Sequence, residues 1–286
     1  MCGFGITWGF WAGLVLPRRV WDFIRSVGAS GDNPVEFRGW RFDLVGPRYR
    51  FRPSVSEVAG FCPSRRDVFL RRVRGLVGEL GVNRGVLVHE FFLEPFRLVR
   101  RGLWGLEELL EGRRRLEERF GVVDGFLRRV FEVGVALALQ VRVDGDMPVS
   151  VEPSVPGGPI GFADVVRPDL LVGLIPVEVT VAPPGSLYGL RKELAVAAYG
   201  LAIEAWTGNP VDYGVVVYVR EVGGEPVLDW RVVVLDDGLR RRVLRERDET
   251  AMIVDEGFDP GPGDPRVCPE WCPFRGVCFG EGVGGQ

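Results

Sequence analysis

The sequence predicts a mixed α/β protein, and three observations favour this fold class. Helical periodicity continues, with interruptions, from residue 54 to about residue 140. Short β-rich runs separated by glycine and proline follow between residues 141 and 183. A strong helix, two strands and a charged helix then complete the pattern up to residue 254, an order typical of chains that combine a sheet with helices.

The composition is that of an ordinary globular protein. The chain has 286 residues, of which 46% are hydrophobic and 26% charged, so it can bury one large core or a core plus a helical subdomain. Residues 1–16 are apolar but lack a basic leader and are too short to span a bilayer, so we expect a cytoplasmic protein without a membrane partner. A frayed terminus, a start codon placed too early or a docking strand would each explain them, and Cys2 has no predicted role.

The N-terminal third predicts short helices joined by breaks. Residues 17–28 suggest a short helix and residues 35–53 an arm rich in proline and aromatic side chains. Ser54 or Ser56 then caps a helix that Cys62-Pro63 interrupts, with a second helix beginning at Ser64.

The C-terminal half alternates strands and helices. The β-rich runs are 141–153 and 160–183, and a helix over 191–206 ends at the Thr207-Gly208-Asn209-Pro210 stop signal. Strands over 212–221 and 227–236, a helix over 239–254 and a glycine- and proline-rich linker over 255–266 complete the pattern.

The cysteines are unevenly placed. Cys62 stands alone, whereas Cys268, Cys272 and Cys278 lie together with C-x3-C and C-x5-C spacing. Grouped thiols in a reducing compartment are typical of a metal site rather than of disulfides. A centre that needs four thiolates would recruit Cys62 across about two hundred residues and hold the two ends of the chain together. Four thiolates would bind Zn²⁺ as readily as they would bind an iron–sulfur cluster, so both alternatives remain at this point.

Arginine runs recur between residues 61 and 130, although the net charge of the chain is −3. A groove that follows a phosphate backbone would collect such side chains, and solvent-exposed helix faces with interspersed glutamates would collect them too. The runs are Arg65-Arg66, Arg71-Arg72, Arg100-Arg101, Arg113-Arg114-Arg115 and Arg128-Arg129.

Asp169 and Glu178 are the candidate ligands of a catalytic cation. A tight connection at Gly173-Leu174 predicts that their strands pair and bring both carboxylates to one edge of a sheet. Such oxygens suit Mg²⁺ or Mn²⁺, an ion that phosphodiester hydrolysis uses to polarise phosphate and supply hydroxide. Glu178 lies among valines, where a carboxylate is costly without a partner. Asp164 is an alternative carboxylate, which a regular strand would direct to the opposite face from Asp169.

His89 is the only histidine of the chain. It follows Gly85 in a G-x3-H arrangement, which lets a helix approach closely and directs an imidazole one turn later. Imidazole can serve as a further ligand of Mn²⁺, while a packed histidine on an apolar helix is the ordinary alternative.

These motifs together resemble the RecB-like nucleases of CRISPR systems. SVSEVAGFCPSRRDVFLRRV, G-x3-H, a PD…E pair, a helix with a trailing tyrosine and C-x3-C-x5-C resemble the Cas-four family, and its archaeal Csa-one branch in particular. The similarity runs from about Gly39 to Phe279. It implies a PD-(D/E)xK (restriction-endonuclease-like) nuclease core, a [4Fe–4S] cluster and a role in trimming or selecting DNA for spacer acquisition. DNA and the integrase complex of CRISPR adaptation are the implied partners.

The resemblance also implies roles for residues and segments. His89, Asp169 and Glu178 become ligands of Mg²⁺ or Mn²⁺, with the backbone carbonyl of Val179 facing the ion. The cluster ligands become Cys62, Cys268, Cys272 and Cys278. The chain then divides into an N-terminal arm (1–53), a helical region with the first cluster cysteine (54–140), the nuclease core (141–255) and a linker with the cysteine-rich tail (256–286).

The chain departs from the family motif at one position. The motif ends E-x-K, whereas this chain has Thr180 two residues after Glu178. Lys192 is the only lysine and lies seven residues before Tyr199, so both side chains share one helical face. A relocated catalytic lysine, with Tyr199 beside it, is one interpretation, and a surface lysine paired with a nearby glutamate is the other.

Three functions follow from these features. The first is a metal-dependent DNA exonuclease that acts on single-stranded ends or overhangs. The second is a DNA-binding subunit of CRISPR adaptation with impaired catalysis, and the third is a structural or electron-transfer iron–sulfur protein. Bases could stack on Phe91, Phe92, Trp104 or Tyr199, although aromatic residues at helical spacing more often belong to a core.

Overall fold

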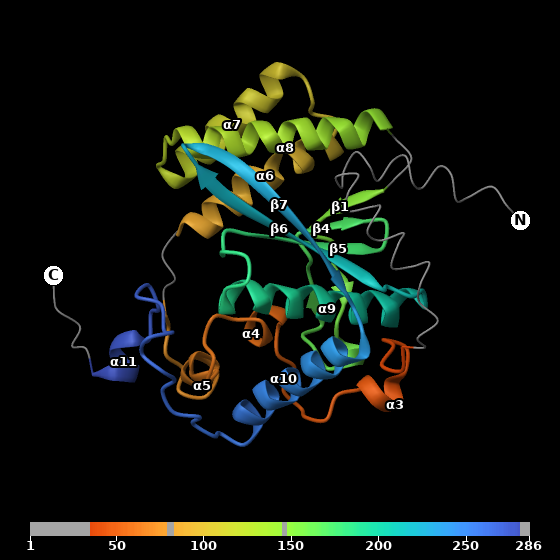
Figure 1. Ribbon diagram of the computed structural model, residues 1–286, viewed down its shortest axis with the longest axis vertical. Helices are drawn as coiled ribbons and strands as arrows, with labels where there is room; N and C mark the ends of the chain where they lie inside the picture. The colour runs from red at the N-terminus through yellow and green to blue at the C-terminus, as the bar shows by residue number, and fades with distance from the viewer. Residues whose placement is uncertain (1–34, 79–82, 145–147, 281–286) are drawn as a thin grey trace, which may run out of the picture.

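The computed structural model describes residues 35–78, 83–144 and 148–280, and they form a mixed α/β fold (Figure 1). This confirms the predicted fold class. The expectations for residues 1–16, residues 17–28 and Cys2 lie outside the described residues. No helix of the described residues is long and apolar enough to cross a membrane.

The centre of the described fold is a five-stranded sheet in the order β1-β4-β5-β6-β7. Its strands are β1 (Val149–Val151), β4 (Leu170–Val172), β5 (Ile175–Thr180), β6 (Tyr213–Val222) and β7 (Glu225–Val234). Strands β4 and β5 form the predicted hairpin at Gly173-Leu174, with Val172 opposite Ile175. Strands β5 and β6 pair in parallel, because the chain crosses between them through the long helix α9 (Leu187–Thr207).

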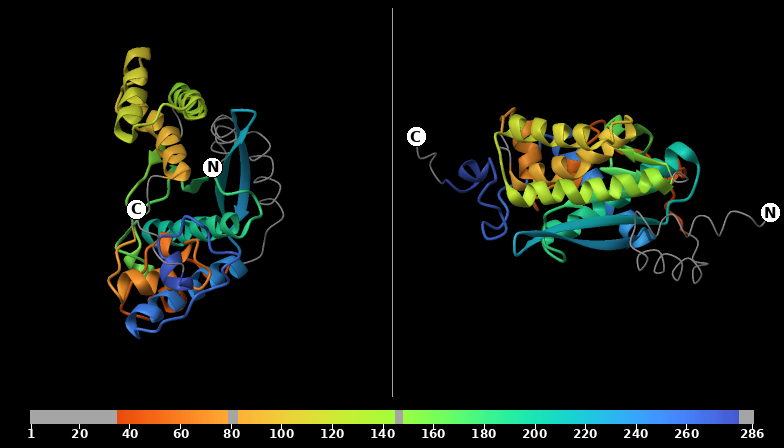
Figure 2. Two further views of the ribbon diagram at one scale, coloured as in Figure 1. Left: turned by 90° about the vertical axis from the view of Figure 1, so that its left-hand side faces the viewer. Right: turned by 90° about the horizontal axis from the view of Figure 1, so that it is seen from above.

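Three helices cover one face of the sheet. Helices α6 (Arg84–Arg100), α7 (Leu106–Phe120) and α8 (Gly125–Asp144) lie on this face (Figures 1 and 2). Their apolar side chains pack against alternate residues of the strands. Val177 and Val179 of β5 point into this core, so the intervening Glu178 points to the other face.

Helix α9 covers the opposite face, together with α10 (Asp237–Asp255) and shorter elements. These are α3 (Phe42–Val45), α4 (Val55–Val58), a 3₁₀ turn (Gly158–Ile160) and the ribbon of β2 (Val155–Pro156) and β3 (Val165–Val166). Every residue of α9 from Leu194 to Glu204 is buried, so this part of the helix is enclosed on all sides. Its predicted end at Gly208 is confirmed, with that glycine in the left-handed conformation.

The structure decides between two predicted caps and corrects two other local predictions. Ser54, not Ser56, is the N-cap of α4 and forms a full capping box with Glu57. Helix α5 (Arg66–Arg72) begins two residues after the predicted Ser64. Residues 141–144 end helix α8 instead of starting a β-rich run, because the helical pattern of α8 continues past residue 140.

The C-terminal tail returns to the N-terminal half of the fold. Helix α11 (Arg275–Phe279) lies beside α5 in Figure 1, although about two hundred residues separate them in the sequence. Phe69 and Leu70 of α5 form a small apolar core with Ile253, Cys272 and Phe274. The α5 region and the C-terminal tail therefore pack together around the cysteines.

Candidate functional site

Asp169 joins two parts of the fold at the edge of the sheet. It directly precedes β4, whose residue Leu170 lies opposite Val177 of β5. Its Oδ2 atom accepts a hydrogen bond from the backbone N–H of Val179 (2.6 Å), and its Oδ1 atom lies 2.8 Å from Nε2 of His89. His89 comes from α6 on the other side of the hairpin, so residues 80 positions apart in the sequence meet here.

Glu178 and Lys192 form an ion pair beside this contact. Lys192 Nζ lies 2.7 Å from Glu178 Oε1, and both side chains are largely shielded from solvent. The lysine comes from α9, the helix that packs on the face of β5 to which Glu178 points. A cavity of about 210 Å³ is lined by Glu178 and Lys192 together with Tyr188 and Tyr199. The geometry therefore brings together every residue that the sequence proposes for catalysis.

Burial and charge shift the pKa values of this group. Burial raises the pKa of Glu178, the charge of Asp169 raises it further, and Lys192 lowers it only in part. Burial lowers the pKa of His89, but the hydrogen bond to Asp169 and the attraction of Glu90 outweigh it and raise the value to about 10. Burial and the neighbouring carboxylates raise the pKa of Tyr199, so its hydroxyl stays neutral.

The donor set at this edge fits a divalent cation. Glu178 Oε2 is buried and has no hydrogen-bond partner among the described residues. A buried carboxylate oxygen without a partner is costly, and it is the group that a cation would satisfy. Once a cation displaces the proton of His89, the residues His89, Asp169 and Glu178 offer one imidazole and two carboxylates, a mixture that suits Mn²⁺ or Mg²⁺. The contact of Val179 in the structure is through its N–H, and the role of its carbonyl stays a prediction.

Sequence reasoning missed two further carboxylates beside His89. One ligand atom each from His89, Glu90 and Glu152 lie within 4.8 Å of one another. Arg97 contacts Glu90 at 3.0 Å and Glu152 at 2.8 Å. The hydrogen bond with His89 and the charge of Arg97 outweigh burial and lower the pKa of Glu90 to about 2. Because Arg97 pairs with both carboxylates and Arg119 also contacts Glu90, we regard them as a support for His89 rather than as the cation site. The adjacency of Glu90 to His89 was the one sequence signal for this cluster.

Thr180 and Asp164 contribute little to the charge of the site. The Thr180 hydroxyl accepts a hydrogen bond from the N–H of Ala182 at 3.1 Å, so it caps the end of β5. The side chain of Asp164 is 91% exposed and pairs with Arg52 at 3.4 Å. Asp169 is therefore the carboxylate that the fold brings to Glu178.

The four grouped cysteines lie around one small hollow. Cys62, Cys268, Cys272 and Cys278 line a space of about 20 Å³, and Phe61 and Phe274 form part of its wall. None of the four forms a disulfide within the described residues. Four thiols around one hollow are the donor set of a [4Fe–4S] cluster or of tetrahedral Zn²⁺. Burial and the nearby Cys268 thiol raise the pKa of Cys272 to about 12, so a metal bound there would displace a proton.

Most of the arginine runs are engaged in ion pairs. Arg65 contacts Glu246 at 2.6 Å, and Arg128 contacts Glu117 at 2.7 Å. Arg71 pairs with Asp67 on its own helix.

The four aromatic residues proposed to stack bases differ in exposure. Phe91, Phe92 and Tyr199 are buried, whereas Trp104 is 40% exposed. Phe91 and Phe92 are therefore core residues and cannot stack a base.

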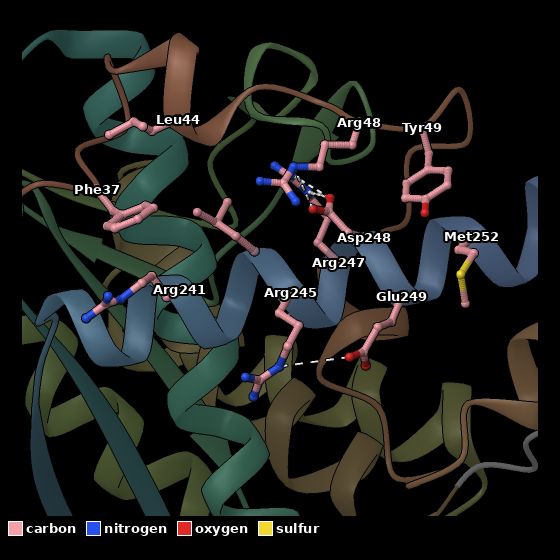
Figure 3. A pocket seen from close by; sticks show the side chains of 11 residues that line it. Phe37, Leu44, Arg48, Tyr49, Arg241, Arg245, Arg247, Asp248, Glu249 and Met252 are labelled. Carbon is pink, nitrogen blue, oxygen red and sulfur yellow. Dashed lines mark hydrogen bonds and ion pairs between the residues drawn. The ribbon is translucent and has the colours of Figure 1, made fainter.

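A second hollow, of about 320 Å³, lies between residues 37–49 and helix α10 (Figure 3). Arg48 and Arg247 both contact Asp248, at 3.5 and 2.6 Å, and Arg245 lies 3.9 Å from Glu249. None of the residues that the sequence proposes for catalysis lines this hollow, and its carboxylates are already paired with arginine. It is larger than the cavity at Glu178 but lacks the chemistry of a cation site.

Comparison with known proteins places these features in a family. The model of the family described as CRISPR-associated exonuclease Csa1 matches residues 16–141 and 127–281. A curated protein named CRISPR-associated exonuclease Csa1, from Thermoproteus tenax, is 28% identical over 85% of the chain and 90% of its own length. A protein of the same name from Saccharolobus solfataricus is 28% identical over 93% of the chain and 97% of its own.

A protein named CRISPR-associated exonuclease Cas4, from Aeropyrum pernix, is 32% identical over 41% of the chain and 58% of its own length. No solved structure matches the chain.

Proposed function

The chain belongs to the CRISPR-associated exonuclease Csa1 family, and from this premise we propose that it is a metal-dependent DNA exonuclease of CRISPR spacer acquisition. We propose that its substrates are single-stranded ends or overhangs and that it works with the integrase complex. The observation that carries the proposal is the buried, unpartnered Glu178 Oε2 next to the His89–Asp169 pair and the Lys192 ammonium.

In this proposal His89, Asp169 and Glu178 hold the catalytic cation at the edge of the PD-(D/E)xK core. A bound Mg²⁺ or Mn²⁺ supplies Lewis-acid polarisation of the phosphate and a water of lowered pKa. The N–H of Val179 holds the Asp169 carboxylate in place, which fixes the orientation of both its oxygens. Tyr199 and Ala195 line the same cavity and restrict the access of bulk water to Glu178.

Lys192 takes the role of the lysine that the motif lacks. Glu178 and Tyr188 raise the pKa of Lys192, although burial lowers it, so the ammonium stays charged at neutral pH. A positive charge at this point offsets the charge that develops on the phosphate in the transition state. Its contact with Glu178 at 2.7 Å supports a lysine supplied from α9 instead of from β5.

The [4Fe–4S] cluster is proposed as a structural clamp. The ligands would be Cys62, Cys268, Cys272 and Cys278, which line one hollow between the tail and the segment before α5. A bound cluster supplies four metal–thiolate bonds that hold these segments together. The cluster has no assigned electron-transfer role in this proposal.

A cleavage assay tests the function. The anaerobically purified protein would be incubated with end-labelled single- and double-stranded DNA in Mg²⁺, Mn²⁺ or EDTA. We expect cutting in both metals and none in EDTA, and we expect Asp169→Asn to lower the rate by roughly two orders of magnitude or more. Asp164→Asn is the matched control, because it removes an exposed carboxylate five residues away, and it should cut like wild type.

The alternative function is a DNA-binding subunit without catalysis, and Thr180 is the observation that favours it. A protein that binds DNA but cuts none of the substrates in either metal would establish this alternative. Cutting that Asp169→Asn leaves unchanged would contradict the proposed active site.

A further inference from the structure

Three aromatic side chains from distant segments meet at the mouth of the candidate active site. We call Phe61, Tyr188 and Trp271 the aromatic shelf. The Trp271 ring packs edge-on against Phe61, with ring centroids 4.7 Å apart and an interplanar angle of 67°. Tyr188 approaches the same indole at 6.5 Å and 61°. They come from the segment after α4, the first turn of α9 and the cysteine tail.

The shelf adjoins the residues that would carry out the chemistry. Phe61 and Tyr188 line the cavity of about 210 Å³ that contains Glu178 and Lys192. The Lys192 ammonium lies 5.6 Å from the centre of the Tyr188 ring, within the range of a cation–π contact. A continuous path of contacts therefore leads from Glu178 through Lys192 and Tyr188 to Trp271. Arg71 lines the same cavity and adds a cationic side chain to its wall.

Trp271 is held by its neighbours and yet leaves its ring in solvent. It is 49% exposed, whereas Cys272 and Phe274, which follow it, are buried against α5. Cys268 and Cys272 on either side of it line the cysteine hollow. The tail therefore fixes the backbone of Trp271, and Phe61 supports one edge of its ring. A large aromatic surface that is rigid and exposed next to a catalytic cavity is suited to ligand binding.

We propose that the aromatic shelf binds an unpaired base of single-stranded DNA adjacent to the phosphate that is cut. This inference rests on the proposed nuclease function and adds to it the surface that selects the substrate. Base–aromatic stacking tolerates every base, so the shelf would recognise single-stranded DNA without recognising its sequence. A base inside a duplex already stacks on its neighbours, so it would have to leave the helix before it reached Trp271. The shelf therefore gives a physical reason for a preference for single-stranded ends.

The tail gains a second task from this placement. Trp271 lies between two of the cysteines that line the hollow, so the cysteine site positions part of the DNA-binding surface as well as closing the fold. The signal in the sequence was the tryptophan inside the C-x3-C motif, but only the fold shows that it meets Tyr188 of α9.

The experiment measures binding separately from cutting. Fluorescence anisotropy in EDTA would give the affinity of wild type, Trp271→Ala and Trp271→Phe for a labelled single-stranded oligonucleotide. Oligonucleotides with one abasic position, moved stepwise along the strand, would locate the base that stacks. Trp206→Ala is the matched control, because Trp206 is 56% exposed and lies at the other end of α9 from Tyr188. Thermal unfolding and visible absorbance would verify that each variant is folded and retains its metal.

We expect Trp271→Ala to weaken binding about 5- to 100-fold, with Trp271→Phe in between and Trp206→Ala equal to wild type. An abasic site at one or two positions of the oligonucleotide should weaken its binding to the wild type by a similar factor. The same abasic sites should not weaken its binding to Trp271→Ala any further. The shelf proposal would be overturned if wild type and a folded Trp271→Ala bound the oligonucleotide equally well. It would also be overturned if abasic sites still weakened binding to that variant. Either outcome would leave the nuclease proposal intact. A wild-type protein that neither binds DNA in this assay nor cuts it in Mg²⁺ or Mn²⁺ would overturn both.

Discussion

At the scale of single residues, the decisive feature is the charge balance around Glu178. The side chains of Asp169 and His89 contact each other beside the ion pair of Glu178 with Lys192. The second carboxylate oxygen of Glu178, Oε2, has no hydrogen-bond partner among the described residues. A buried group of this kind is costly for stability and useful for cation binding, so its presence at the sheet edge is a functional signal. The partly exposed arginine pairs on the surface of the helices carry no comparable signal.

Sequence patterns could predict these residues individually but not their contacts. The valines around Glu178 indicated a buried carboxylate, and the spacing of Lys192 and Tyr199 indicated a shared helical face. The ion pair of Glu178 with Lys192 depends on how α9 lies on β5, which no local pattern specifies. Glu152 escaped prediction for the same reason, because it reaches Arg97 of α6 from a left-handed backbone position after β1.

At the scale of secondary-structure elements, helix α9 connects the cysteine hollow with the cavity at Glu178. Arg191 is buried next to Lys192 and donates hydrogen bonds to the backbone carbonyls of Val58 and Gly60, just before Cys62. It also lies 3.4 Å from Glu246 of α10. The position of Lys192 is therefore fixed by the same contacts that fix the segment leading to the first cysteine.

Elements were predicted well where their pattern is local and less well at their ends. The β4–β5 hairpin and the stop of α9 were signalled by Gly173 and Gly208, and both are confirmed. The strand order was not predictable, because the pairing of β1 with β4 and the parallel pairing of β5 with β6 are long-range contacts. The capping box of Ser54 and Glu57 shows that a cap is defined by the hydrogen bonds that form rather than by residue type alone.

Asp237 supports the first described segment from the start of α10, and a pH series tests this contact. It accepts hydrogen bonds from the backbone N–H groups of Glu36 and Phe37 at 2.9–3.0 Å. Burial raises the pKa of Asp237, but these two hydrogen bonds outweigh it and the pKa is lowered. Asp237 therefore contributes fully to the free energy of unfolding at pH values above the pKa that it has in the unfolded chain. This contribution is lost as the pH falls through the lower pKa that Asp237 has in the folded protein.

We expect Asp237→Asn to lower the free energy of unfolding at pH 7 by about 0.5 kcal/mol, a figure reduced for solvent screening. The difference in the free energy of unfolding between Asp237→Asn and wild type should become smaller below about pH 4. Urea unfolding at pH 7, 5, 4 and 3 measures it, with the exposed Asp164→Asn as control. A difference that stays constant over the series would show that the carboxylate charge is not involved.

At the scale of the whole molecule, the cysteine hollow joins the segment around Cys62 to the C-terminal tail, and we propose that a metal bound there clamps the two together. Cys62 and Cys278 line one hollow although 216 positions separate them in the sequence. Closing so long a loop removes conformational entropy mainly from the unfolded chain, so a bound metal would stabilise the fold as a whole. The sequence predicted this clamp from spacing alone, because cysteine patterns indicate metal chemistry directly, but spacing does not separate iron from zinc.

Cys272→Ser tests the clamp and the identity of its metal together. We expect the variant to lose the brown colour of an iron–sulfur protein and most of the about four irons per chain, and to become less soluble. Mn²⁺ binding at Glu178 should change far less. Iron and zinc analysis, visible absorbance and calorimetric Mn²⁺ titration measure these quantities, with Cys2→Ser as the matched cysteine control.

Unchanged visible absorbance in Cys272→Ser would contradict the ligand assignment. A colourless wild-type protein that contains zinc would show that the cysteines bind zinc instead of an iron–sulfur cluster.

We propose that this chain retains a working nuclease site in which Lys192 replaces the lysine of the motif. The rate of cutting by Lys192→Ala and by the double variant Lys192→Ala/Thr180→Lys tests it most directly. Thr180 lies two residues after Glu178 on the same strand face, so a lysine there would extend toward the same carboxylates. Arg231→Ala, which breaks an ion pair with Glu193 of α9, is the matched control.

We expect Lys192→Ala to slow cutting by roughly two to three orders of magnitude. We expect the added Thr180→Lys change to restore a substantial part of the rate, and Arg231→Ala to have no effect. Cutting by Lys192→Ala at the wild-type rate would contradict the proposal.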